Sequence, residues 1–363
     1  MQPKKEILLI IPSLTGGGAE KVFLKLCKYL DKNKYNITLC LLKKEGEFVT
    51  LLNAEDGYRV HNLNISRVRY AIFPLLAYIR KLKPNVVVST LGHLNALLAV
   101  LIPFLPKKTT IVAREANIVS KKQYNYITMF LYKTFYKKFH YIIGQSDDMI
   151  KDLMFIVNIK HDQIIKINNP INYIEIENSL NNTNKKLLPL NKINLLSVGS
   201  LTYQKGYDLL LNSFSKFKDI NDYHLTILGK GELHDELVEL CKKLEIESNV
   251  TFAGFIADPY PYMSESDIFI SSSRFEGFPN AVLEALACDT PVISNNYLGG
   301  INEIINDPLY GKIIDIANDS VFEDSCLLVT KMDQNKNSIK NNIIERYGLE
   351  IIIKKYESFF DSL

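Results

Sequence analysis

Two glutamates separated by seven residues are the side chains of this sequence best suited to bind a polyol. Glu276 follows an apolar run, and Glu284 lies in a helical segment that Pro279 opens, at the position that proline favours. An ionised carboxylate can accept two hydroxyl donors at once, so the pair suits a ligand such as a sugar joined to a ribose. The plainer alternative makes Glu276 a helix N-terminal charge and Glu284 a solvated surface residue.

Two further loops offer contacts to phosphate. Main-chain amides of residues 278–281 stand at a predicted helix start, where the helix dipole favours an anion. Lys205 stands beside Gly206 at the start of another predicted helix, six residues after Gly199, which ends an apolar run. A lysine at this place can contact a phosphate group, although a lysine in a loop is more often simply solvated.

A glycine run near the N-terminus is the third candidate for phosphate contact. Gly16, Gly17 and Gly18 follow the apolar run Ile7–Ile11, and glycines let main-chain amides approach a phosphate closely. The run matches neither the P-loop pattern nor the dinucleotide-binding pattern, and no acidic residue follows a second predicted strand at the required spacing. The sequence therefore disfavours dinucleotide binding.

Each of these loops must be positioned by a strand that ends where the loop begins. Short aliphatic runs alternate with amphipathic helical segments, starting at Ile7–Ile11 and restarting at Asn194–Val198. This alternation predicts an α/β protein with two Rossmann-like, doubly wound domains. Because ligands of such sheets bind at the carboxyl ends of the strands, we expect the two domains to face across a cleft that holds the ligand.

A polar stretch sets the expected domain limits. Residues 168–186 contain many asparagines and few large apolar side chains. We therefore expect an N-terminal domain over residues 1–170 and a C-terminal domain over residues 187–345. The final segment, residues 346–363, has helical periodicity.

The composition excludes several classes of protein. The 363 residues are 47% hydrophobic and 23% charged, which rules out a disordered, collagen-like or coiled-coil chain. A net charge of +3 gives no argument for nucleic-acid binding, and the five cysteines form no C-x-x-C pair. The apolar runs are too short for a signal peptide or a membrane span, so we expect a cytoplasmic chain.

A basic and aromatic segment, residues 121–139, has two interpretations. Ile127, Phe130, Leu131 and Phe135 lie close together on a helical wheel, and lysines flank them. Such a helix can lie in an anionic membrane interface, which would place the chain peripherally on the inner face of the plasma membrane. It can equally pack on the N-terminal sheet as an ordinary amphipathic helix.

Together these motifs resemble the retaining, nucleotide-sugar-dependent glycosyltransferases of family four, which have the GT-B fold. The resemblance spans essentially the whole chain, from the Gly-Gly-Ala-Glu run at Gly17 to the highly specific Glu-Gly-Phe-Pro block at Glu276. It implies that Glu284 holds the donor ribose, that Glu276 and the following amides hold the donor sugar, and that Lys205 contacts the diphosphate. It also implies that Gly17 and Gly18 face the donor and that the closing helix crosses back to the N-terminal domain.

Two departures from the family pattern concern the site. The family usually has an arginine where this chain has Ser200, and Arg274 is our candidate for replacing its charge. The family often has a histidine where this chain has Glu115, and His93 is the second candidate for that role. The catalytic candidates are therefore Glu276, Lys205, Glu115 and His93. The donor-binding candidates are Gly17, Gly18, Lys205, Arg274, Glu276, Gly277, Phe278, Pro279, Asn280 and Glu284.

The expected function is transfer of a hexose or N-acetylhexosamine from a nucleotide-diphosphate donor, taken as a UDP-sugar, with retention of anomeric configuration. The expected acceptor is a glycan or a polyprenyl-diphosphate-linked sugar. No D-x-D motif or His/Cys cluster occurs, so we expect no metal or other cofactor. Two alternatives stay open: a sugar-nucleotide epimerase, against which the glutamate block argues, and a non-catalytic accessory subunit, which Ser200 favours.

Overall fold

The structure is a computed structural model that describes residues 3–122, 124–182, 186–331 and 338–363. The chain divides into two compact units. Unit 1 comprises residues 1–170 and 350–363, and unit 2 comprises residues 171–349.

Unit 1 is built on a parallel sheet which, in the part of the chain that the structure describes, has seven strands in the order β3-β2-β1-β4-β5-β6-β7. Its two central strands, β1 and β4, are nearly continuous apolar runs, as expected for parallel strands covered on both faces. The strands are β1 (Lys5–Ile11), β2 (Tyr35–Leu41), β3 (Arg59–Asn62), β4 (Val86–Thr90), β5 (Thr110–Arg114), β6 (Tyr141–Gly144) and β7 (Ile164–Lys166).

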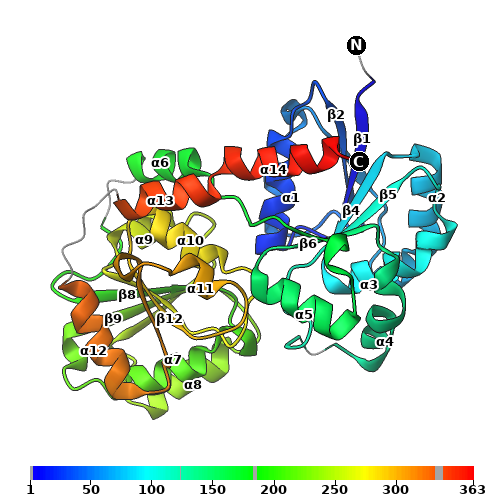
Figure 1. Cartoon of the computed structure of the whole chain (residues 1–363). Helices are drawn as coiled ribbons and strands as arrows, with labels where there is room; N and C mark the ends of the chain where they lie inside the picture. The colour runs from blue at the N-terminus through cyan, green and yellow to red at the C-terminus, as the bar shows by residue number, and fades with distance from the viewer. Residues whose placement is uncertain (1–2, 123, 183–185, 332–337) are drawn as a thin grey trace. The chain divides into compact units, whose positions relative to one another are not determined.

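Helices cover the sheet of unit 1 (Figure 1). They are α1 (Gly18–Tyr29), α2 (Ile72–Leu82), α3 (Gly92–Leu101), α4 (Tyr126–Phe135), α5 (Asp147–Val157) and the C-terminal α14 (Leu349–Asp361). Lys5 Nζ donates a hydrogen bond to the Phe360 carbonyl oxygen at 2.8 Å, and the Tyr35 hydroxyl donates to Asp361. The C-terminal helix therefore packs beside β1 and β2 of unit 1.

Unit 2 repeats the same plan with six parallel strands among the described residues, in the order β10-β9-β8-β11-β12-β13. The strands are β8 (Ile193–Val198), β9 (Tyr223–Leu228), β10 (Val250–Gly254), β11 (Ile268–Ser271), β12 (Val292–Asn295) and β13 (Gly311–Ile314). The helices are α6 (Tyr173–Asn181), α7 (Tyr207–Phe214), α8 (His234–Lys243), α9 (Tyr260–Glu265), α10 (Asn280–Ala287), α11 (Ile301–Ile304), α12 (Asp319–Thr330) and α13 (Ser338–Tyr347).

Both sheets are doubly wound, which confirms the predicted fold class. In each unit, the chain first adds strands on one side of the first strand and then adds the remaining strands on its other side. The winding therefore reverses between β1 and β4 in unit 1 and between β8 and β11 in unit 2. Neighbouring residues of β8 belong to different apolar clusters, Leu195 to one and Leu196 to the other, because successive side chains of a strand point to opposite faces. Each sheet is therefore covered on both faces.

The chain passes between the two units at Pro170–Ile171 and again at Leu349–Glu350. The main-chain amide of Ile171 donates to the Tyr347 carbonyl oxygen at 2.8 Å, and Ile171 forms a parallel bridge with Gly348. The two passages thus leave unit 2 side by side. Residues 171–182, which lie between the two domains expected from the sequence, belong to unit 2 and include α6.

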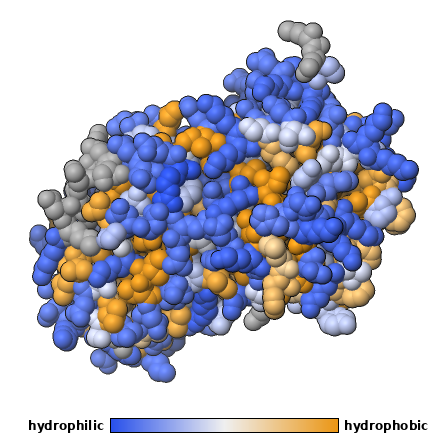
Figure 2. Space-filling model, in the orientation of Figure 1, coloured by the Kyte–Doolittle hydropathy of each residue, from blue (hydrophilic) through white to orange (hydrophobic). Residues whose placement is uncertain are grey.

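The surface is mainly polar on the face that Figure 2 shows, where groups of apolar residues lie between the hydrophilic ones. Within residues 3–122, 124–182, 186–331 and 338–363, no helix combines the length and the apolar character that a bilayer span requires.

Candidate functional site

The loop after β8 brings Lys205 to the carboxyl end of the sheet of unit 2. A 3₁₀ turn, η7 (Tyr203–Lys205), is followed by Gly206 with a φ of 65°, a left-handed conformation that favours glycine. A Cβ atom at Gly206 would overlap the carbonyl oxygen of Ser272, in the loop after β11. The glycine therefore lets the two loops pack main chain against main chain, which places Lys205 beside the residues that follow β11.

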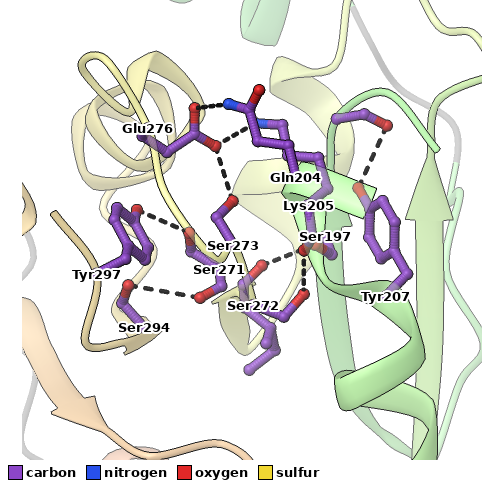
Figure 3. A network of polar contacts seen from close by, with 12 residues as sticks. Ser197, Gln204, Lys205, Tyr207, Ser271, Ser272, Ser273, Glu276, Ser294 and Tyr297 are labelled. Carbon is purple, nitrogen blue, oxygen red and sulfur yellow. Dashed lines mark hydrogen bonds and ion pairs between the residues drawn. The ribbon is translucent and has the colours of Figure 1, made fainter. Parts of the chain in front are cut away.

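In Figure 3, dashed lines join the Glu276 carboxylate to Gln204, Lys205 and Ser273. Its Oε1 lies 2.6 Å from Lys205 Nζ and accepts a hydrogen bond from Ser273 Oγ at 2.7 Å. Its Oε2 accepts a hydrogen bond from Gln204 Nε2 at 3.1 Å. Only 7% of Glu276 is exposed, and a buried carboxylate is stable only where donors replace the water that it loses. Three donors from two loops thus hold this carboxylate in one place.

A pocket lined by hydroxyl groups opens beside this network. Ser272 Oγ donates to the Lys205 carbonyl oxygen at 2.8 Å, and Ser271 Oγ shares a hydrogen bond of 3.0 Å with the Tyr297 hydroxyl (Figure 3). The pocket lies where β8 and β11 end, which is the point at which the winding of the sheet reverses. Ligands of doubly wound sheets bind at this point.

The N-terminus of α10 forms another wall of the pocket. Pro279 precedes the helix, and Pro279, Ala281 and Val282 line the pocket. The first amides of a helix, with its dipole, suit an anion. Glu284 lies further along α10 and is also buried, but it is outside the residues that line the pocket in the described chain. Burial, and after it the Glu284 carboxylate, raise the pKa of the neighbouring Tyr260.

The Arg274 side chain binds Asp208. Its Nη1 and Nη2 donate to the two carboxylate oxygens of Asp208 at 2.8 and 2.6 Å, and its guanidinium carbon lies 4.1 Å from the centre of the Tyr203 ring. The hydrogen bonds from Arg274 lower the pKa of Asp208. The idea that Arg274 replaces the arginine missing at Ser200 therefore requires this bidentate pair to open, and it stays a prediction.

Gln204 and Ser273 bind Glu276 but were not among the residues predicted for the site. Gln204 adjoins Lys205, and Ser273 precedes Glu276 by three residues, so both stood in loops expected at the same sheet edge. Glutamine and serine are common in loops of every kind, so the residue types at these two positions did not indicate a binding role. Gly299, in the loop after β12, has a φ of 128°, and a Cβ there would overlap the Glu276 carbonyl oxygen.

The remaining candidates lie in unit 1. Gly17 and Gly18 follow β1, with Gly17 as the N-cap of α1. His93 is exposed near the start of α3, and its ring meets the Tyr124 ring edge-on with centroids 5.5 Å apart. Partial burial and then the charge of Lys122 lower the pKa of His93.

The structure buries Glu115 completely, at the end of β5. Its Oε1 accepts hydrogen bonds from Asn95 Nδ2 at 3.0 Å and from the Tyr132 hydroxyl at 3.1 Å, and the Tyr136 hydroxyl also donates to it. Loss of solvation raises the pKa of Glu115 to about 7, although the hydrogen bonds from Asn95 and Tyr132 act in the opposite direction. A direct contact between Glu115 and a substrate would require this cluster to open.

Helix α4 has two faces. Thr128 and Tyr132 are buried in unit 1, whereas Tyr126, Ile127 and Phe130 are 85%, 68% and 52% exposed. Of the apolar stripe expected from the helical wheel, Leu131 and Phe135 pack partly against the core of unit 1, whereas Ile127 and Phe130 face outward. In the described part of the chain, no three His, Cys, Asp or Glu side chains gather in a way that could hold a metal ion.

Comparison with known proteins gives a consistent set of similarities. Residues 179–346 match the family described as Glycosyl transferases group 1. The N-acetylgalactosamine-N,N'-diacetylbacillosaminyl-diphospho-undecaprenol 4-alpha-N-acetylgalactosaminyltransferase of Campylobacter jejuni is 28% identical over 351 residues, which cover 92% of each chain. The amylovoran biosynthesis glycosyltransferase AmsD of Erwinia amylovora is 22% identical over 98% of this chain and 99% of its own. The crystal structure of Anabaena Alr3699/HepE with UDP and glucose superposes with a TM-score of 0.83 at 17% identity, covering 98% of this chain and 99% of that one.

Proposed function

Because this chain is a group 1 glycosyltransferase with two Rossmann-like domains of the GT-B type, we propose that it transfers a hexose or an N-acetylhexosamine from a UDP-sugar. The acceptor is a glycan or a polyprenyl-diphosphate-linked sugar, and the anomeric configuration is retained. The observation that carries the proposal is the Glu276 carboxylate, held beside Lys205 and the N-terminus of α10 at the reversal point of the sheet.

The named substrates of similar proteins support this choice of donor and acceptor. The Campylobacter protein is named for transfer to a diphospho-undecaprenol-linked sugar, and the Anabaena structure contains UDP and glucose. A nucleotide diphosphate that leaves as an anion fits the positive charge of Lys205 and the positive end of the α10 dipole. A sugar ring with several hydroxyl groups fits the Glu276 carboxylate.

The residues of the pocket have separate tasks in this proposal. Lys205 and the amides at the start of α10 stabilise the departing diphosphate, and Glu276 orients the sugar so that the acceptor hydroxyl meets the anomeric carbon. In the free protein Lys205 and Glu276 neutralise each other across 2.6 Å. Donor binding therefore exchanges part of this ion pair for contacts with the donor.

We propose that the positive charge needed by the diphosphate comes from the protein, so that transfer is independent of added metal ions. The test is a thermal-shift assay with UDP, GDP, ADP and their sugars, with and without EDTA. A UDP-sugar should stabilise the protein equally in both conditions. Stabilisation that EDTA removes would contradict metal independence, and a stronger response to GDP- or ADP-sugars would correct the donor.

The activity itself is tested by incubating the protein with UDP-sugars and a panel of octyl glycosides, followed by NMR of the product. We expect a new glycosidic bond with the anomeric configuration of the donor. An inverted product would refute retention. A nucleotide-sugar that is epimerised without acceptor would favour the epimerase, and nucleotide binding without any reaction would favour the accessory subunit.

We also propose that unit 1 contacts the cytoplasmic membrane surface through residues 121–139. Tyr126, Ile127 and Phe130 form an exposed apolar face on α4, and the flanking lysines suit anionic headgroups. Vesicles that contain phosphatidylglycerol should sediment the protein, and I127S/F130S should bind them about tenfold more weakly. Equal binding to pure phosphatidylcholine vesicles, or unchanged binding of the variant, would contradict the contact.

A further inference from the structure

A carboxylate at the carboxyl edge of unit 1 has no role in the site described above. Glu20 is the third residue of α1, and only 6% of it is exposed. Its side chain turns back toward the glycine run after β1, where Oε1 accepts a hydrogen bond from Thr15 Oγ1 at 3.3 Å. Glu20 closes the Gly-Gly-Ala-Glu run, of which only the glycines received a role from the sequence.

Gly17 provides the space for this carboxylate. The backbone of Gly17 has a φ of −88° and a ψ of 169°, an extended conformation that any residue adopts. A Cβ atom at Gly17 would nevertheless lie 2.5 Å from Glu20 Oε2. A side chain at Gly17 would therefore displace the Glu20 carboxylate, whereas the backbone conformation itself does not favour glycine.

The pKa of Glu20 is raised overall, because burial outweighs the contacts that favour its ionised form. Burial raises its pKa, whereas its own main-chain amide, Thr15 and the charge of Arg114 act in the opposite direction. Arg114 is itself buried, and its hydrogen-bond partners among the described residues, Thr90, Asn169 and Tyr356, are uncharged. Glu20 thus shares the carboxyl edge of β1, β4 and β5 with a buried cation.

This edge is where a ligand of unit 1 would bind. The winding of the sheet reverses between β1 and β4. Glu20 lies in the helix that follows β1, and Thr90 is the last residue of β4. An ionised carboxylate has about four acceptor positions, and the contacts with Thr15 and its own amide use two of them. The remaining capacity suits hydroxyl groups.

We infer that Glu20 binds a hydroxyl group of the acceptor sugar at the carboxyl edge of unit 1, with its carboxylate seated against Gly17. The inference rests on the proposed transferase activity, since an epimerase or an accessory subunit has no acceptor. Glu20 is then a substrate-binding residue of unit 1, as Glu276 is of unit 2.

The test compares Glu20→Gln and Gly17→Ala with the wild type, with the octyl glycoside that the wild type uses best as probe. We expect both changes to raise the acceptor KM about 10- to 100-fold, the effect of losing a hydrogen bond to a charged group. For Glu20→Gln, the KM for the UDP-sugar and its slow hydrolysis without acceptor should change less than about twofold. Glu55→Gln, which alters an exposed carboxylate of unit 1, is the matched control.

Two outcomes would overturn the inference while the proposed function stands. An unchanged acceptor KM in Glu20→Gln would show that the carboxylate binds no acceptor. A parallel loss of UDP-sugar hydrolysis would assign Glu20 to the donor or to the fold. The double variant G17A/E20A should be no worse than E20A, because the steric conflict needs the carboxylate. If the wild type itself transfers sugar to no glycoside, the proposed function fails and this inference falls with it.

Discussion

Replacement of Lys205 by alanine should weaken UDP binding by about 5- to 30-fold. A charge-assisted hydrogen bond to a phosphate contributes about 2–3 kcal/mol. Against this stands the ion pair with Glu276 at 2.6 Å, which the phosphate must displace and which contributes about 1 kcal/mol at a partly exposed position. The difference is about 1–2 kcal/mol, which gives the stated range.

Glu276→Gln separates the contact of Lys205 with the phosphate from its ion pair with Glu276. The variant removes the carboxylate charge that competes with the phosphate for Lys205 and keeps the shape of the side chain. This variant should bind UDP as tightly as the wild type or up to about fivefold more tightly, since Lys205 is released from the pair. It should bind the UDP-sugar more weakly than the wild type does, because the amide is a poorer acceptor for the sugar hydroxyls.

Isothermal titration calorimetry with UDP measures both effects without any need for an acceptor. Lys218→Ala, which removes an exposed lysine from the same unit, is the matched control and should leave UDP binding unchanged. Wild-type affinity of Lys205→Ala for UDP would refute the placement of the diphosphate. A loss of UDP affinity in Glu276→Gln as large as that in Lys205→Ala would refute the competition.

Three further predictions concern other parts of the structure. Gly299→Ala should lower the melting temperature and abolish transfer, because its Cβ would overlap the Glu276 carbonyl oxygen; unchanged melting in calorimetry would contradict this. The raised pKa of Glu115, about 7, makes the folded state bind a proton that the unfolded chain releases near pH 4.5. Urea unfolding should therefore show stability falling by up to about 3 kcal/mol from pH 4.5 to 7, and Glu115→Gln should flatten this slope. If Arg274 replaces the missing arginine, Asp208→Asn should tighten UDP binding and Arg274→Ala should weaken it; equal affinities would assign Arg274 to the fold alone.

The sequence by itself determined the fold class, and it predicted that Lys205 and Glu276 would lie at the same edge of one sheet. Alternating strand and helix patterns require parallel sheets, and parallel sheets collect the loops of neighbouring strands at one edge. Lys205 and Glu276 are 71 residues apart in the chain, yet both were expected at the carboxyl ends of strands in the same sheet. Local patterns were sufficient here because the loops after parallel strands such as β8 and β11 all leave the sheet at its carboxyl edge.

Only the tertiary structure decided which side chains meet. The contacts of Gln204 and Ser273 with Glu276, and of Arg274 with Asp208, depend on how two loops pack around Gly206, which no periodicity encodes.

Burial was also decided at the tertiary level. Glu115 follows β5 as a ligand residue would, but it lies inside a cluster of tyrosines from α4 and the turn after it. The helical wheel of α4 gives the spacing of its apolar residues, whereas the neighbouring elements determine which of them are covered. Solvent exposure depends on what packs against a residue, and that partner is set by the whole fold rather than by the local sequence.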